Sequence, residues 1–193
     1  MIIENTKLEG VLLLKPRVFK DDRGYFFEAY SQKTLKENGL DLNFVQDNIS
    51  RSSFGTVRGL HYQVGANAQG KLVQAVKGTV LDVAVDIRVN SPTFGQHVAV
   101  ELSGENNFQL WIPPGFAHGF SVLSEEAYFH YKCTALYSKQ DERAIRFDDP
   151  DLNINWQVPE IIMSEKDKLA GRFKDIAPDF YYSGDTFQAA VKE

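Results

Sequence analysis

The sequence contains little sulfur and no long apolar run. Cys133 is the only cysteine among 193 residues, which excludes an intrachain disulfide and a zinc site built from cysteines, and fits a reducing compartment. Near the N-terminus the longest apolar run is four residues, at 11–14, after an acidic and polar lead. Such a run is too short for a signal peptide or a membrane span. We therefore expect a cytoplasmic protein that does not enter a membrane.

A concentration of positive charge is also missing. The net charge is -5, with acidic and basic residues interspersed, so there is no basic stripe of the kind that binds a phosphate backbone. Nucleic acid is not an expected partner. Repeats, low-complexity tracts and linker-like segments are absent from the sequence. We expect one domain over residues 1–193, with a core at roughly 1–170 and a tail, 171–193, to which we assign no role.

What the sequence does contain is many short strand-like segments. The clearest alternation of apolar and polar residues lies at 79–89, where Leu81, Val83 and Val85 share one face and Asp82 and Asp86 the other. Further strands are expected at 11–19, 25–30, 44–49, 57–63, 71–77, 96–102, 108–112, 118–123 and 127–137. This spacing is typical of an antiparallel β-sandwich or barrel, in which inward-facing polar side chains converge on one pocket.

Helical signals are few. Ser31 is a candidate N-cap with Gly39 as a stop, and Ser164 is a second candidate N-cap with Gly171 as a stop. Both segments are short, and we expect them at the periphery of an all-β core.

His61, in the segment RGLHYQ at 58–63, has three possible roles: a core residue, a metal ligand or a catalytic base. A metal site on a β-barrel favours His-x-His with a further acid, whereas Tyr62 and Gln63 follow His61 here. We therefore expect no metal. Strict alternation would place Arg58 and His61 on opposite faces of a strand, so both can face one pocket only if the strand bulges at Gly59.

Three other residues also allow two interpretations. His118, in PPGFAHGF, either caps a barrel corner or donates to an anionic or carbonyl oxygen of a ligand. Tyr131 is either a core tyrosine or a general acid. Asp167 stands where a capping-box partner belongs, yet it could instead orient a histidine. The pattern alone leaves these alternatives open.

The motifs, taken in order, resemble the family of deoxythymidine diphosphate (dTDP)-4-dehydrorhamnose 3,5-epimerases. The resemblance covers roughly residues 1–170. It rests on DDRGYFFE at 21–28, FVQDNIS at 44–50, RGLHYQ at 58–63, QGKLVQAVKGTVLDVAVDIR at 69–88, PTFGQ at 92–96, LWIPPGFAHGF at 110–120, YKCT at 131–134, FDDPDLNINW at 147–156 and SEKD at 164–167.

The resemblance implies a cupin-type jelly-roll β-barrel that needs neither a metal nor an organic cofactor. It also implies a homodimer in which an N-terminal segment completes the partner's sheet and site. The expected reaction inverts C3 and C5 of dTDP-4-dehydro-6-deoxy-D-glucose. Alternatives within the fold are a mono-epimerase acting on C3 or C5 alone and a 3,4-ketoisomerase; a sugar-nucleotide-binding barrel without activity is a third.

The resemblance also implies roles for individual residues. His61 matches the base and Asp167 its partner, Tyr131 matches the acid on the opposite face of the sugar, and Lys71 lies beside the C4 oxygen. Residues matching positions that hold the nucleotide sugar are Arg23, Glu28, Gln46, Asn48, Arg58, His118, Glu142 and Lys166, with Arg23 and Glu28 reaching into the neighbouring protomer's site and Phe26 and Tyr137 enclosing the thymine ring. Arg143 departs from the family, where a glycine is common, which puts the shape of this loop in question.

Overall fold

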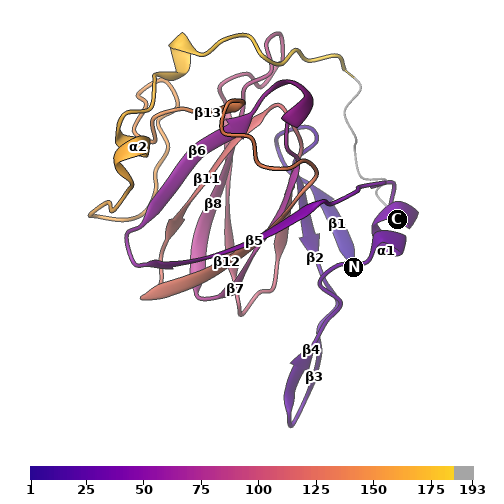
Figure 1. Ribbon diagram of the computed structural model, residues 1–193. Helices are drawn as coiled ribbons and strands as arrows, with labels where there is room; N and C mark the ends of the chain where they lie inside the picture. The colour runs from indigo at the N-terminus through magenta and orange to yellow at the C-terminus, as the bar shows by residue number, and fades with distance from the viewer. Residues whose placement is uncertain (185–193) are drawn as a thin grey trace.

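Two antiparallel sheets face each other in the computed structural model, which describes residues 1–184 (Figure 1). The six-stranded sheet has the order β1 (Ile2–Asn5), β2 (Leu12–Lys15), β10 (Gln109–Ile112), β7 (Lys71–Lys77), β12 (Glu126–Cys133), β5 (Gln46–Ser53). The five-stranded sheet has the order β13 (Glu142–Ala144), β6 (Val57–Gln63), β11 (Phe116–Val122), β8 (Thr79–Asp86), β9 (His97–Ser103). The prediction of an all-β jelly-roll barrel is confirmed.

The remaining elements are small. They are the hairpin β3 (Phe19–Asp21) and β4 (Gly24–Phe26), the helices α1 (Gln32–Glu37) and α2 (Glu165–Lys168), and two 3-10 turns at Gly65–Asn67 and Phe173–Asp175. In the described part of the chain, no helix has the length and apolar character needed to cross a membrane. Residues 185–193 of the unassigned tail lie outside the described residues.

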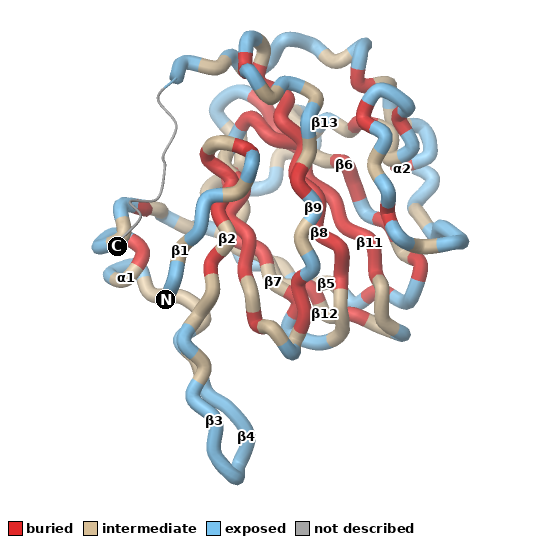
Figure 2. The backbone as a smooth tube through the Cα atoms, turned by 180° about the vertical axis from the view of Figure 1, so that it is seen from behind, coloured by how far each residue is buried: buried red, intermediate tan, exposed pale blue. Residues whose placement is uncertain are grey.

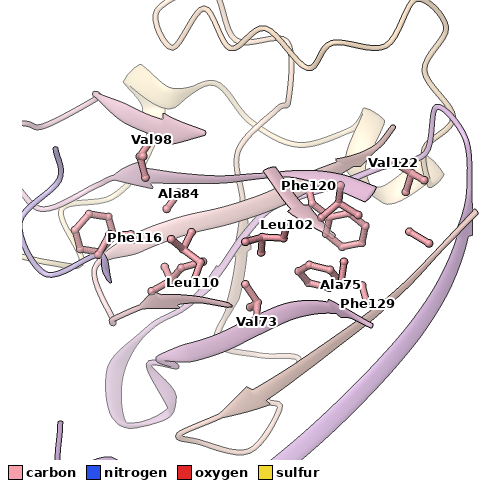
Figure 3. Close-up of a cluster of buried hydrophobic side chains, with 14 of the residues drawn as sticks. Val73, Ala75, Ala84, Val98, Leu102, Leu110, Phe116, Phe120, Val122 and Phe129 are labelled. Atoms are coloured by element: carbon pink, nitrogen blue, oxygen red, sulfur yellow. The ribbon is translucent and has the colours of Figure 1, made fainter. Parts of the chain in front are cut away.

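The core lies between the two sheets. Large side chains from both layers, among them Phe120, Phe129, Leu102 and Leu110, interdigitate there (Figure 3). Such burial is the main stabilising term for a barrel of this size. A second cluster covers the outer face of the five-stranded sheet and includes Trp156.

β8 confirms the alternation found at 79–89. Leu81, Val83 and Val85 join the outer cluster, whereas Asp82 and Asp86 point the other way. Both carboxylates are fully buried, because hydrophobic clusters pack on both faces of the five-stranded sheet. Each has a cationic or imidazole partner, as buried charges require.

Several element boundaries differ from expectation. The strand expected at 11–19 ends at Lys15, since Pro16 cannot donate to a strand ladder. Ser31 and Ser164 are N-caps as predicted, each accepting a backbone N–H bond from the first turn. However, α2 ends at Lys168 rather than near Gly171, because the Gly171 carbonyl accepts from Arg146 N and the chain there is extended. The short strands β1, β3 and β13 were not expected, and the strand expected at 25–30 is found only as β4, Gly24–Phe26.

The hairpin β3–β4 projects away from the barrel (Figures 1 and 2). Every residue of the two strands is exposed, including the large side chains of Phe19, Tyr25 and Phe26. Phe26 is 70% exposed. Phe19 and Phe26 are paired across the hairpin, so their exposed side chains share one of its faces.

The bulge predicted at Gly59 is present. His118 and Phe120 of β11 pair with His61 and Arg58 of β6. The two paired positions are two residues apart on β11 but three residues apart on β6, so β6 contains one extra residue. Gly59 has a φ of +124°, a conformation that L side chains rarely adopt. The extra residue turns both Arg58 and His61 toward the same cavity.

Replacing Gly59 by alanine should therefore cost roughly 2–4 kcal/mol of unfolding free energy. A Cβ atom at this position would lie 2.5 Å from the Cα of Gly119, in addition to the unfavourable φ. Urea unfolding of Gly59→Ala and Gly65→Ala measures the difference. Gly65 has a φ of +63° and open space around it, so its variant should lose only about 1 kcal/mol. Equal losses would show that the close approach is not a constraint.

Candidate active site

A cavity of about 970 Å³ opens between the two sheets. A neighbouring cavity of about 340 Å³ shares three of its lining residues, His61, Lys71 and Tyr131. All four residues predicted to be catalytic, including Asp167, line the larger cavity. The structure therefore brings together side chains from β6, β7, β12 and α2 that are far apart in the sequence.

His61 is joined to Asp167, with 2.6 Å between Nε2 and Oδ1. Asp167 is only 4% exposed, and the Ser164 hydroxyl accepts a bond from its backbone N–H. The cap at Ser164 thus fixes the start of α2 and so aims the carboxylate at the imidazole. The side chain of Asp167 serves His61 and not a capping box, which resolves the alternative left open by the sequence.

The hydrogen-bond partners of Asp167 favour the ionised form of its carboxyl group. Burial by itself raises the pKa, but the hydrogen bonds from His61 and Ser164 outweigh it and hold the pKa below the ordinary value. The ionised Asp167 carboxylate can accept a hydrogen bond from the Nε2–H group of His61, which leaves Nδ1 as the ring nitrogen that can take up a proton.

His118 forms a second histidine–carboxylate pair, 2.9 Å between Nε2 and Oδ2 of Asp82. It lies within β11 and not at a barrel corner. Burial lowers the pKa of His118, although Asp82 opposes this. The other oxygen of Asp82 is buried and has no hydrogen-bond partner among the described residues.

Lys71 brings a positive charge to the same region. Burial lowers the pKa of its ammonium group, and nearby acidic groups, Asp82 and Glu142 among them, oppose that shift. No ion pair of Lys71 is found within residues 1–184, so the ammonium group is available to an oxygen of a bound ligand.

Tyr131 approaches the cavity from the facing layer. It belongs to β12 of the six-stranded sheet, whereas His61 belongs to β6 of the five-stranded sheet. Burial raises the pKa of the Tyr131 hydroxyl, so the phenol is protonated at neutral pH. A proton donor and a proton acceptor therefore line one cavity from opposite sheets.

Four of the ten predicted binding residues, Gln46, Asn48, Tyr137 and Glu142, line the smaller cavity, and Arg58, His118 and Lys166 line the larger one. Gln46 donates to Asn48 and accepts from the backbone N–H of Tyr137. Glu142 accepts from the Tyr137 hydroxyl and pairs with Lys166. Burial opposes ionisation of Glu142, but these two bonds keep its pKa below the ordinary value. Within residues 1–184, the hydrogen bonds of the Arg143 side chain go to the backbone carbonyls of Gln140 and Glu142.

Three predicted binding residues are not in either cavity. Arg23, Phe26 and Glu28 lie on or beside the projecting hairpin, where Arg23 pairs with Asp21 and Glu28 accepts from Thr34. Within one chain they therefore have no access to the site.

Three lining or supporting residues were not identified from the sequence. Asp82 lies on the carboxylate face of 79–89, but its partner His118 is distant in sequence. Ser50 and Ser52 continue the inward row of β5 begun by Gln46 and Asn48. Alternation along 46–52 was the signal that could have revealed them. In the described residues, no three His, Cys, Asp or Glu side chains cluster in a way that could hold a metal ion.

The Asp167–His61 pair predicts a pH-dependent contribution to stability. Because the carboxyl pKa is lowered on folding, the contribution is complete above the ordinary value of 3.8 and is lost as the pH falls through the folded-state pKa. Asp167→Asn should lower the unfolding free energy by about 1–3 kcal/mol at pH 7. This difference in unfolding free energy from the wild type should become smaller below pH 3.8.

Chemical unfolding at several pH values measures this gap. Glu165→Gln removes the same charge from the same helix at an exposed site and should change stability by less than about 0.5 kcal/mol at every pH. A gap for Asp167→Asn that stays constant down to the acid limit would contradict the assigned pairing.

Comparison with known proteins agrees with this geometry. Residues 5–175 match the family model described as dTDP-4-dehydrorhamnose 3,5-epimerase. The enzyme of that name from Shigella flexneri is 52% identical over 176 residues, covering 91% of this chain and 97% of the relative.

Solved structures give the same result. A 3,5-epimerase from Legionella pneumophila, in complex with dTDP-4-keto-L-rhamnose, is 47% identical with a TM-score of 0.91, and the match covers 94% of this chain and 98% of that one. A 3'-monoepimerase from Streptomyces bikiniensis, in complex with dTDP-quinovose, is 31% identical with a TM-score of 0.84, covering 89% and 87%. The chain belongs to the dTDP-4-dehydrorhamnose 3,5-epimerase family.

Proposed function

We propose that this protein inverts C3 and C5 of dTDP-4-dehydro-6-deoxy-D-glucose to give dTDP-4-dehydro-L-rhamnose, a step toward dTDP-L-rhamnose. The observation that carries the proposal is the placement of His61 and Tyr131 on facing sheets of one cavity. Inversion requires that a proton leave one face of a carbon and return to the other. Family membership supplies the substrate class.

His61 is the proposed base. The proton on a carbon next to the C4 ketone is weakly acidic, and a neutral imidazole held by Asp167 can remove it through the free nitrogen. The imidazolium that forms is stabilised by the Asp167 carboxylate 2.6 Å away. No metal or organic cofactor is part of this proposal.

Lys71 is the proposed partner of the C4 oxygen. Removing the proton places negative charge on this oxygen in an enolate, and a buried ammonium group stabilises such charge strongly. His118 has a different role, because its Nε2 bond to Asp82 and its lowered pKa leave an acceptor at Nδ1 of a neutral ring. We assign to it a hydroxyl of the sugar.

Tyr131 is the proposed acid. It donates its proton to the same carbon from the opposite side, which sets the inverted configuration. The imidazolium of His61 then loses its proton to solvent, the Tyr131 phenolate regains one from solvent, and the cycle is repeated at the second carbon. In this proposal the nucleotide is held by Gln46, Asn48, Tyr137 and Glu142, which line the smaller cavity, and by Lys166, which lines the larger cavity and pairs with Glu142. A cytoplasmic location is also proposed, supported by the unpaired thiol of Cys133.

A homodimer with exchange of the N-terminal segment is part of the proposal. A diphosphate is best bound by guanidinium groups, and the hairpin carries Arg23 on a projecting, exposed arm. Its exposed aromatic residue Phe26 could then enclose the thymine ring with Tyr137 of the other protomer, and Glu28 could reach the same site.

A mono-epimerase is the second candidate function. The likeness to the 3'-monoepimerase from Streptomyces bikiniensis favours it, since that protein shares the fold at a TM-score of 0.84. A 3,4-ketoisomerase uses related chemistry. A binding protein without activity is disfavoured by the presence of both the base and the acid.

His61→Ala should abolish exchange of the C5 proton with solvent, because the variant lacks the proposed base and Asp167 acts only through His61. Deuterium entry into the substrate, followed by NMR, measures this exchange, and the affinity for dTDP should stay within about threefold of the wild type. His97→Ala, which replaces a histidine outside both cavities, is the control. Exchange by His61→Ala at the wild-type rate would rule out His61 as the base.

Mixing two inactive variants tests the exchanged hairpin. If Arg23 acts in the partner's site, a heterodimer of His61→Ala and Arg23→Ala contains one site with both defects and one intact site. Mixed protomers should then regain roughly a quarter of wild-type activity after refolding together at equal amounts. If Arg23 acts within its own chain, every site remains defective and mixing restores nothing.

A further inference from the structure

Gln109 is a buried polar residue that lies away from the core between the two sheets. It belongs to β10, where Leu110 and Ile112 join that core and Gln109 shares the outer face with Trp111. Gln109 is only 2% exposed. Burying an amide is costly unless its N–H groups find acceptors, so the partners of Gln109 identify its role.

One partner of Gln109 lies at the foot of the projecting hairpin. Residues 27–30, the hairpin stem, connect β4 to the N-cap of α1 and belong to no helix or strand. Nε2 of Gln109 donates to the backbone carbonyl oxygen of Ala29 in this stem, at 2.8 Å. Within residues 1–184, it is the only hydrogen bond that joins residues 16–30 to either barrel sheet. Beside it, Tyr30 packs on the hydrophobic cluster that contains Trp111.

The other partner fixes the orientation of the Gln109 amide. Nε2 of Gln109 also donates to Oε1 of Gln74 at 2.8 Å, and Nε2 of Gln74 lies 3.3 Å from Nδ1 of His130. The three residues are direct cross-strand neighbours on β10, β7 and β12. Because an amide offers an acceptor on one side and two donors on the other, this row determines where the Gln109 N–H groups point. Gln74 and Ala29 each receive one of them.

The direction of the hairpin depends on two attachments to the barrel. The first is Lys15, where β2 ends, and the second is the stem. In the described residues the strands β3 and β4 pair only with each other, so the attachments set where the projecting tip lies (Figure 1). Arg23, at the tip, is six residues from Ala29. Such a length of extended chain spans roughly 20 Å, so a tilt of about 10° at the stem moves Arg23 by roughly 3 Å.

We propose that Gln109 is a positioning residue for the exchanged hairpin. Its bond to Ala29, oriented by Gln74, holds the stem at a fixed angle and thereby places Arg23 at the diphosphate in the other protomer's site. This inference rests on the proposed function, because it requires that the hairpin act in the other protomer. A residue on the outer face of one barrel, outside both cavities, then controls substrate binding in the neighbouring one.

The test asks in which protomer's site Gln109 acts. Gln109→Met keeps a long, unbranched side chain but removes both donors. KM and kcat are measured with dTDP-4-keto-6-deoxyglucose, first for the homodimer and then after refolding with a large excess of His61→Ala chains. In that mixture almost every Gln109→Met chain receives a hairpin whose stem is intact. Gln96→Met is the control, because Gln96 is exposed and lies outside both cavities.

The expected result is a change in KM that follows the hairpin and not the catalytic residues. The Gln109→Met homodimer should have a KM roughly three- to tenfold above the wild-type value, with kcat within about twofold, because hairpin contacts bind substrate and transition state alike. In the mixture the KM should return to the wild-type value. Conversely, wild-type chains in a large excess of the double variant His61→Ala/Gln109→Met should acquire the raised KM. A loss of stability in the variant chain would instead follow that chain's own site.

Gln74→Met is a second variant, which serves also if Gln109→Met does not fold. It leaves the donors of Gln109 in place but removes the group that orients them. The KM of its homodimer should rise by about twofold, and the rise should disappear in an excess of His61→Ala chains. Urea unfolding of each variant reports whether the fold is intact.

Two results overturn the inference. A KM that stays raised when Gln109→Met chains are paired with His61→Ala chains would place the effect in the chain's own site. A wild-type KM in every folded variant of Gln109 and Gln74 would show that the stem bond does not position the hairpin.

Arg23→Ala in the same excess of His61→Ala chains separates these results from a failure of the proposed function. Recovery of the wild-type KM by Arg23→Ala but not by Gln109→Met would reject the role of Gln109 alone. A raised KM in both mixtures would reject the exchange of the hairpin. A wild-type protein that does not epimerise the substrate would refute the proposed function itself.

Discussion

The close approach of two backbones at Gly59 and Gly119 is the constraint on which the site depends. A Cβ on Gly59 would lie 2.5 Å from Gly119 Cα, and one on Gly119 would lie 2.6 Å from the Arg58 carbonyl oxygen. Side chains are therefore excluded from both positions. Without the bulge, alternation would send Arg58 and His61 to opposite faces of β6. A local packing requirement thus places the imidazole of His61 and the guanidinium group of Arg58 in one cavity.

The second organising feature is the balance of buried charge. Asp167 partners His61, Asp82 partners His118, and Glu142 pairs with Lys166. Lys71 and Arg58 remain without carboxylate partners in the described residues. Lys71 lines both cavities beside His61 and Tyr131, so its charge is suited to an anion that exists only during the proposed reaction, the enolate.

The sequence predicted the β-rich core, the N-caps at Ser31 and Ser164, and the bulge, because alternation, capping and glycine are local signals. It could not decide the role of Asp167, since a capping box and a histidine partner look identical until α2 is placed beside β6. Asp82 was missed because its partner, His118, is distant in the sequence and is brought next to it only by the fold. Arg23 and Glu28 were assigned only through resemblance, and within one chain they stay outside the cavity.

In the proposed mechanism one base and one acid, on facing sheets, act in turn on the two carbons that flank the C4 ketone. The most direct measurement is NMR of the product formed by the wild type in deuterated water. The account predicts deuterium at both C3 and C5, each with inverted configuration. Label confined to one carbon, or label without inversion, would contradict it.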